Sequence, residues 1–182
     1  MLNYRTNVDG TQTTACIKEG LSVADVYDKQ KYHLETTQEA GLPDEHAFYH
    51  MLYIFRWLVD NQMIDPEFRD DFADEFNWYM SGECSVIELY EGMDGCLTGD
   101  MLTDEANAFG DHYFSLEEGT NYLPDLEHAL DPGDHYASLY HIRYNEENYQ
   151  TMKAIIDRRY SEWKLAQAQV KSPPKWWPFG KN

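Results

Sequence analysis

Two histidines spaced four residues apart are the first candidates for chemistry in this sequence. His46 and His50 would lie on one face of a helix, and a metal ion can be bound by two imidazoles in that arrangement. The sequence offers no evident third ligand, and the glutamate placement of a zinc-protease helix is missing. We therefore expect no metal site and no cofactor, and interpret both histidines as surface or packing residues.

Thiols and carboxylates provide the other candidate groups. Cys84 or Cys96 could act as a nucleophile only if the fold placed His112 or another base beside it. The alternative is that both cysteines are small buried hydrophobes. Asp and Glu are so abundant that two could lie at the separation of a glycosidase pair by chance, and nothing singles out one pair. A hydrolase that uses carboxylates or a cysteine–histidine pair remains an alternative, and no catalytic residue is assigned.

The charge distribution is the strongest global feature. The formal net charge of the 182 residues is −19. Residues 65–134 contain 20 Asp and Glu but one basic residue, Arg69, whereas the rest of the chain has 13 acidic and 13 basic residues. A field of this sign repels nucleic acid and anionic membranes and attracts cationic surfaces. We therefore expect a cationic protein partner, with no direct nucleic-acid or membrane binding. A generic acidic surface that only confers solubility is the alternative.

The acidic segment is expected to present its charge on helices. Asp65-Pro66 is a helix start with Asp at the N-cap and Pro at the first helical position, and Gly82 ends this helix. Its inward stripe is Phe68, Phe72, Phe76 and Tyr79. Ser85 is expected to cap a further short helix. The acidic residues of these two helices and of the link between them are expected to face solvent. They form the predicted binding surface: Asp70, Asp71, Asp74, Glu75, Glu83, Glu88 and Glu91.

The stretch from Glu45 to Val59 predicts a central helix that the other helices surround. One broad apolar face is formed by Phe48, Met51, Leu52, Phe55, Leu58 and Val59. Asp44 is the expected N-cap. The apolar run is too short for a membrane span, and His50 and Arg56 interrupt it. The residues expected in the core are Phe48, Phe55, Phe72, Phe76, Ile156 and Trp163.

The remaining segments also favour helices, separated by cap and break signals. A short helix is possible between Leu21 and His33, and Asn145 is expected to cap a long last helix. Leu139–Arg143 is the only stretch whose pattern is also compatible with an extended strand. The fold class is therefore all-α, a single-domain irregular helical bundle around a central apolar helix. Its expected parts are a loose N-terminal arm (1–20), a helical domain (21–170) and an aromatic tail (171–182) that contains Trp176 and Trp177. With three free cysteines and no apolar signal segment, a cytoplasmic location is expected.

From Tyr27 to Phe179 the sequence resembles a family of small all-helical bacterial domains. The residues that carry the resemblance are Tyr27-Asp28 with His33; Gly41-Leu42-Pro43; Asp94-Gly95 followed by Leu102–Phe109; Ser138–His141; Glu147-Asn148-Tyr149; Asp157–Tyr160 with Glu162–Lys164; and Lys175–Phe179. Lys31-Tyr32-His33 lacks the tryptophan expected beside the histidine, and the arm before Ser22 has no counterpart.

This family resembles, in turn, the immunity proteins of contact-dependent growth inhibition, a toxin–immunity system. The resemblance implies a small acidic cytoplasmic protein, without enzymatic activity, that blocks a basic toxin domain. The toxin class it implies is an RNase, with the EndoU type preferred. The identity and target of the toxin do not follow from the sequence.

Overall fold

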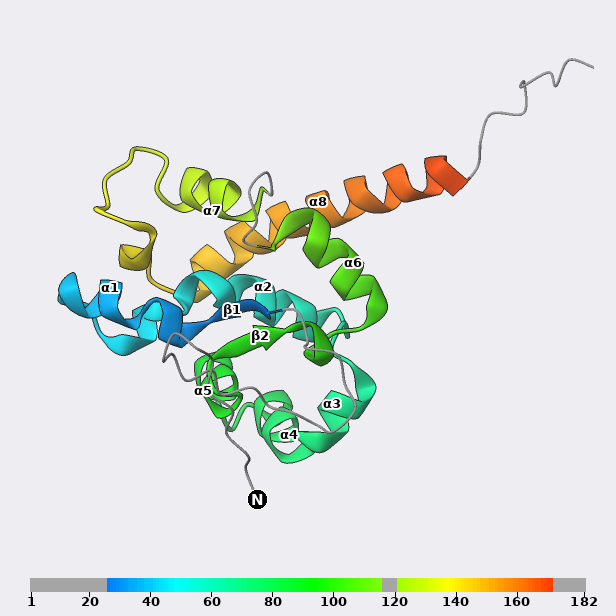
Figure 1. Ribbon diagram of the computed structural model, residues 1–182, viewed down its shortest axis with the longest axis horizontal. Coiled ribbons are helices and arrows are strands. Elements are labelled where there is room, and N and C mark those ends of the chain that lie inside the picture. Colours follow the sequence, from blue (N-terminus) through cyan, green and yellow to red (C-terminus); the bar gives the residue numbers. More distant parts are fainter. Residues whose placement is uncertain (1–25, 116–120, 172–182) are drawn as a thin grey trace, which may run out of the picture.

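The computed structural model of the chain describes residues 26–115 and 121–171. Within these ranges, eight α-helices and one two-stranded sheet enclose one apolar core (Figure 1). The helices are α1 (Leu34–Glu39), α2 (Tyr49–Asp60), α3 (Pro66–Asp71), α4 (Ala73–Ser81), α5 (Val86–Gly92), α6 (Asp104–Tyr113), α7 (Tyr122–Leu130) and α8 (Glu146–Lys171). The predicted all-α fold is confirmed. The predicted arm (1–20), and the predicted tail beyond Lys171, lie outside the described residues.

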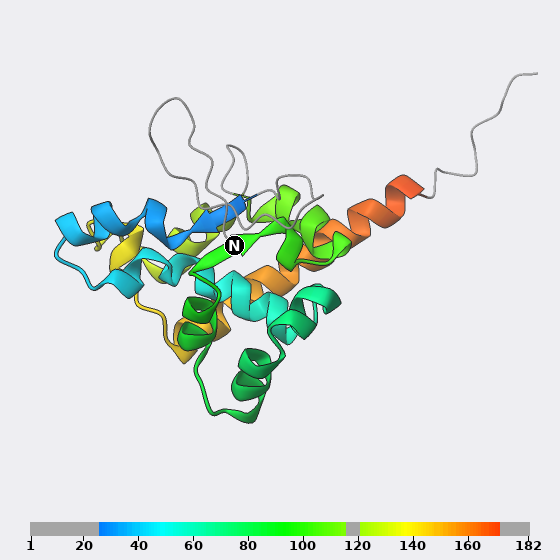
Figure 2. The same cartoon turned by 60° about the horizontal axis from the view of Figure 1, so that its bottom comes forward.

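Helix α2 lies at the centre of the core, as the sequence predicted. Nine of its 12 residues are buried, and it packs against α5 and α8 (Figures 1 and 2). The predicted start at Asp44 is wrong. Residues Asp44–Ala47 form a 3-10 turn, η2, and the backbone leaves helical geometry at Phe48 (φ −128°, ψ 1°). Within η2, His46 Nδ1 lies 2.6 Å from the carbonyl oxygen of Tyr140, a distant contact that no local pattern reveals.

The first part of the acidic segment, residues 65–92, forms three short helices, α3, α4 and α5. The Asp65 side chain accepts from the backbone N–H groups of Glu67 and Phe68, as expected of an N-cap, and Gly82 ends α4 with φ +78°. The single helix predicted between them is broken at Phe72 (φ −115°, ψ 33°) into α3 and α4.

The predicted core residues are buried with one exception. Phe48, Phe55, Phe76, Ile156 and Trp163 are buried, with at most 8% of each exposed. Phe72 is only half-buried, because it lies at the break between α3 and α4 and stacks on the equally half-buried Phe68, with ring centroids 4.7 Å apart.

A short antiparallel sheet covers one side of α2. Strands β1 (Val26–Lys29) and β2 (Cys96–Thr98) pair with Asp28 opposite Leu97. The helix that the sequence favoured over Leu21–His33 is wrong for Val26–Lys29. The stretch Leu139–Arg143 is not a strand either, because Leu139–His141 forms a 3-10 turn, η4. The sheet buries Asp28, a charged residue, against the core.

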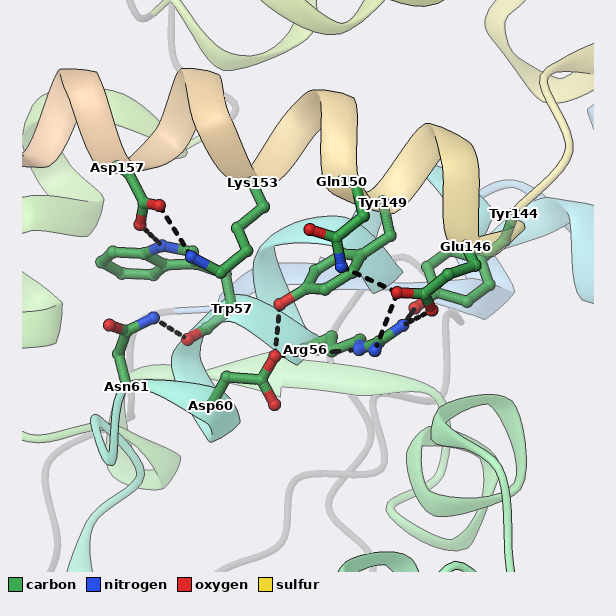
Figure 3. A network of polar contacts seen from close by, with 10 residues as sticks. All are labelled: Arg56, Trp57, Asp60, Asn61, Tyr144, Glu146, Tyr149, Gln150, Lys153 and Asp157. Atoms are coloured by element: carbon green, nitrogen blue, oxygen red, sulfur yellow. Dashed lines mark hydrogen bonds and ion pairs between the residues drawn. The ribbon is translucent and has the colours of Figure 1, made fainter.

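Polar side chains join the C-terminal half of α2 to α8 (Figure 3). Trp57 Nε1 donates to Asp157 Oδ1 over 2.7 Å, and Arg56 donates to Glu146 Oε2 over 2.7 Å. The Arg56 guanidinium also lies over the Tyr149 ring, 3.8 Å from its centroid, in a cation–π contact. These contacts hold the C-terminal half of α2 against α8. Asn145 caps α8 as predicted, because its Oδ1 accepts from the backbone of Asn148.

A bidentate ion pair ties α7 to α8. Arg159 donates from Nε and Nη2 to the two carboxylate oxygens of Asp125 over 2.7 and 2.8 Å, and the Tyr113 hydroxyl donates to the same carboxylate. Burial alone would raise the pKa of Asp125, but the hydrogen bonds from Arg159 and Tyr113 more than offset this, and the pKa is lowered.

Asp125→Asn is expected to reduce the free energy of unfolding by about 1–3 kcal/mol at neutral pH, since it breaks hydrogen bonds to a charged partner. The native pKa lies below the ordinary value of about 3.9, so the contribution is present above that pH and is lost as the pH falls through the native pKa. Urea unfolding of wild type and variant at neutral pH and at about pH 2 tests this. A difference that does not shrink in acid would contradict it.

None of the helices in the described part of the chain combines the length and the apolar character that crossing a membrane requires.

Candidate functional site

The predicted acidic residues all lie on or between α3, α4 and α5. They are Asp70 and Asp71 on α3, Asp74 and Glu75 on α4, Glu83 between α4 and α5, and Glu88 and Glu91 on α5. Six of them are exposed, and Glu75 is half-buried. We call this set the acidic face. Figure 2 shows that the chain carrying α4 and α5 projects from the lower side of the body, which leaves the face open to a partner.

The acidic face contains a pocket and an exposed tryptophan. The pocket, of about 320 Å³, lies between α4 and α5 and is lined by Glu75, Trp78, Cys84, Glu88, Leu89 and Gly92. Trp78 is 54% exposed. On α4, Asp74 and Glu75 precede Trp78 by four and three residues, so the three side chains share one side of the helix.

Glu88 is fixed at this pocket by the start of α5. Its carboxylate accepts from the backbone N–H and the hydroxyl of Ser85 over 2.7 and 2.8 Å, while Ser85 Oγ accepts from the backbone of Glu88. This is the predicted Ser85 cap, completed as a capping box. The hydrogen bonds from the Ser85 backbone and hydroxyl lower the pKa of Glu88, so its charge is retained near neutral pH.

Several carboxylates outside the acidic face form ion pairs, and most of those on it form none with a described residue. Elsewhere, Asp125, Glu146 and Glu105 form ion pairs with Arg159, Arg56 and Lys164. On the acidic face, six carboxylates form no ion pair with any described residue: Asp70, Asp74, Glu75, Glu83, Glu88 and Glu91. Arg159 and Lys164 of α8 and Arg56 of α2 therefore neutralise acids that lie outside the acidic face.

The Cys84 thiol reports the electrostatic environment of the pocket. Burial and the nearby charges of Glu88 and Glu83 raise its pKa, which disfavours the reactive thiolate. Cys84 is therefore a poor nucleophile, and Sγ lies 4.0 Å from the carbonyl oxygen of Glu75.

Glu88→Gln is expected to accelerate alkylation of Cys84 about twofold at low salt, the effect of removing a like charge worth about 0.2–0.5 kcal/mol. Glutamine can also complete the capping box, so α5 should be retained. Peptide-resolved mass spectrometry after iodoacetamide treatment measures Cys84 alone. An equal rate in both proteins at low salt would mean that the Glu88 charge does not act on the thiol.

A second cluster of ionisable side chains is buried between the sheet and α2. Asp28 on β1 and His50 on α2 are 2% and 4% exposed, and His33 directly precedes α1. His33 Nε2 lies 2.6 Å from Asp28 Oδ1, and His50 Nε2 lies 3.1 Å from Asp28 Oδ2. Burial by itself would raise the pKa of Asp28, but its contacts with His33 and His50 lower it to about 2. One carboxylate is thus held between two imidazoles.

Two polar groups of this buried cluster have no hydrogen-bond partner in the described part of the chain. They are Asp28 Oδ2, whose contact with His50 is too poorly aligned for a hydrogen bond, and His50 Nδ1. The other nitrogen of His33, Nδ1, is 2.7 Å from the Tyr140 hydroxyl on η4.

The expectation that His50 lacks further ligating partners is wrong. The structure separates His50 from His46, which faces the Tyr140 carbonyl, and places His50 with Asp28 and His33 instead. One ligating atom from each of these three residues lies within 4.8 Å of the others, close enough for the three to bind one metal ion. Sequence reasoning missed the set because its members come from three different elements.

Comparison with known proteins places this architecture in a family. Residues 26–142 match the family described as a domain of unknown function, DUF7832. The match covers more than half of the chain, from the first residue of β1, which carries Asp28, to the residue after η4, which carries Tyr140.

The chain belongs to the DUF7832 family. No curated protein and no solved structure matches it. The DUF7832 region contains the acidic face and the buried cluster, whereas α8 lies beyond it. The sequence signals for the buried cluster are Tyr27-Asp28, His33 and Ser138–His141, which also carry the resemblance to the bacterial family. The fold brings Asp28, His33 and Tyr140 together.

Proposed function

We propose that this DUF7832 chain is an immunity protein that binds a cognate basic toxin domain in the cytoplasm and neutralises it by covering its active site. The observation that supports this most is the acidic face, where Asp70, Asp74, Glu75 and Glu91 form no ion pair with any described residue and Trp78 is exposed among them. Unpaired charge of one sign attracts a surface of the opposite sign and favours it over other partners.

The pocket between α4 and α5 suits a lysine or arginine side chain of the partner. Glu75 and Glu88 provide negative charge, and the indole of Trp78 provides a π face for a cation. Arginine is the better fit, because its planar guanidinium can bind a carboxylate through two hydrogen bonds and stack on an aromatic ring. An exposed tryptophan beside such a pocket also has the chemistry of an interface hot spot.

A nuclease is the toxin class that this chemistry favours. Nuclease clefts are basic because they bind phosphates, so a carboxylate surface can occupy the position of the RNA backbone. Occupation of the cleft would exclude RNA without any chemical step by the immunity protein. The resemblance to immunity proteins of contact-dependent growth inhibition supports an RNase, with the EndoU type preferred.

The alternatives account for fewer of the observations. A cysteine hydrolase built on Cys84 would need a lowered thiol pKa, whereas burial and neighbouring acids raise it. An acidic surface that served solubility alone would not require an exposed tryptophan beside a pocket lined by two glutamates.

The test is binding of the purified chain to a basic RNase toxin domain encoded beside it, with an EndoU-type domain as the first choice. Calorimetry should give one complex of defined stoichiometry, and RNA cleavage should fall in proportion to the immunity protein added. A cationic protein without nuclease activity serves as the control, and it should bind only weakly and lose binding as salt rises.

Two results would contradict the proposal. If the chain binds the control protein as well as the toxin domain, the acidic face is a non-specific polyanion. If no basic nuclease domain binds, the immunity function fails.

A further inference from the structure

We propose that Asp28, His33 and His50 bind a divalent transition-metal ion, with Zn²⁺ the best match. The site is separate from the acidic face, and the inference does not depend on the proposed immunity function. It replaces the sequence-based expectation that the chain has no metal site. The three residues provide two imidazole nitrogens and a carboxylate, a combination that zinc uses in proteins. The set contains no sulfur ligand, so it does not favour Cu(I) or an iron–sulfur cluster.

Burial of Asp28 is the first argument for an ion. Its side chain is 1% exposed, and no described lysine or arginine forms an ion pair with it. A buried carboxylate is costly unless its charge is compensated and its oxygens are hydrogen-bonded. Here Oδ2 has no hydrogen-bond partner among the described residues. A cation between the carboxylate and the two imidazoles would compensate the negative charge, and Oδ2 could bind to it.

The geometry requires only small movements. Asp28 Oδ1 lies 2.6 Å from His33 Nε2, and Asp28 Oδ2 lies 3.1 Å from His50 Nε2. Ligand atoms about 2.1 Å from a tetrahedral zinc ion lie roughly 3.4 Å from one another. The two carboxylate–imidazole distances therefore need to lengthen by less than about 1 Å, which exchanges one hydrogen bond for bonds to the ion. The two imidazole nitrogens, which lie within 4.8 Å of each other, need to approach by at most about 1.4 Å.

The surroundings of His33 fit those of a metal-bound histidine. With Nε2 bound to an ion, the proton of His33 is on Nδ1, and it can be donated to the Tyr140 hydroxyl 2.7 Å away. Metal-bound histidines generally make such a bond, which fixes the tautomer and the ring orientation. Tyr140 is therefore a positioning residue, held over the site by η4.

Three protein ligands leave at least one coordination position for water or another small ligand. The side chains of Asp28 and His50 are at most 2% exposed, whereas that of His33 is 17% exposed, so exchange with solvent occurs on the His33 side. The ion would join β1, the start of α1 and the central helix α2, which makes it a stabilising element of the fold.

The experiment uses the full-length chain, stripped with a chelator and titrated with ZnCl₂. Calorimetry and elemental analysis should find one zinc per chain, and zinc should raise the melting temperature. Asp28→Asn and His50→Gln should each weaken zinc binding by more than about 10–100-fold, the usual cost of losing only an outer-shell partner. His46→Gln is the matched control, because His46 is also buried and contacts Tyr140 but lies outside the ligand set. This control should bind zinc as wild type does.

A measurement on wild type keeps the test valid if a ligand variant fails to fold. Nitrogen-15 NMR of the histidine rings should show that zinc shifts the Nε2 resonances of His33 and His50, and leaves those of the exposed His112 unchanged. Absence of stoichiometric zinc in the titrated wild type would overturn the proposal. Zinc that binds with equal affinity to the folded His50→Gln and Asp28→Asn variants would also overturn it, because the ion would then lie elsewhere.

Discussion

Reversing Asp70, Asp71, Asp74 and Glu75 to lysine is expected to slow association with the toxin domain by about one or more orders of magnitude at low salt. These residues lie at the junction of α3 and α4, on the acidic face. Charges at the rim of an interface act mainly on the rate of encounter. The difference should shrink as salt rises, because the Debye length falls from about 30 Å at 0.01 M to about 8 Å at 0.15 M. Stopped-flow kinetics at these two salt concentrations measures it.

A matched variant separates local from global charge. Lysine at Glu35, Glu39, Glu127 and Glu147 changes the net charge equally at four exposed sites on α1, α7 and α8. This control should associate nearly as fast as wild type. Equal slowing of both variants would mean that total charge governs encounter, and equal rates for wild type and the first variant would exclude the acidic face as the docking surface. Trp78→Ala should instead mainly increase the dissociation rate.

Phe109→Ala is expected to reduce the free energy of unfolding by about 3–5 kcal/mol, the usual cost of deleting a fully buried phenylalanine ring. Phe109 on α6 is 0% exposed. Its ring centroid lies 5.2–5.9 Å from those of five other aromatic residues: Trp57, Tyr113, Phe114, Tyr160 and Trp163. Such a cluster cannot collapse into the space left by one ring without losing its other contacts. Urea denaturation followed by far-UV circular dichroism gives the value.

Two aromatic residues outside this cluster calibrate the result. Trp78→Ala removes a 54% exposed ring and should cost less than about 1 kcal/mol. Phe72→Ala, at the half-buried break, should fall between the two values. A cost below about 1 kcal/mol for Phe109→Ala would show that the aromatic cluster is not well packed in solution.

Local signals predicted much of the helical fold. The caps at Asp65, Ser85 and Asn145, and the apolar face of α2, depend on residues within a few positions of one another. These interactions are present in the sequence pattern itself. The acidic segment could be predicted to lie on an open surface for the same reason.

The sheet and the buried cluster depend on distant contacts, whereas the break in the acidic helix has no signal in the sequence pattern. β1 is a strand because β2, about 70 residues later, provides its hydrogen bonds. Phe72 ends α3 although its own residue type and spacing continue the apolar stripe. His50 was paired with its sequence neighbour His46, because no periodic pattern could show that β1 and the turn before α1 lie over α2.

The bond between His33 and Tyr140 joins residues 107 positions apart, and this separation has a consequence for biosynthesis. A ribosome that adds about 5–20 residues per second needs roughly 5–20 s to reach Tyr140 after it has made His33. Throughout that interval, β1 and the start of α1 lack the turn that covers them. Nascent chains that stall before η4 should therefore expose the apolar side of α2 and become substrates for chaperones, although most of the helices have already been synthesised.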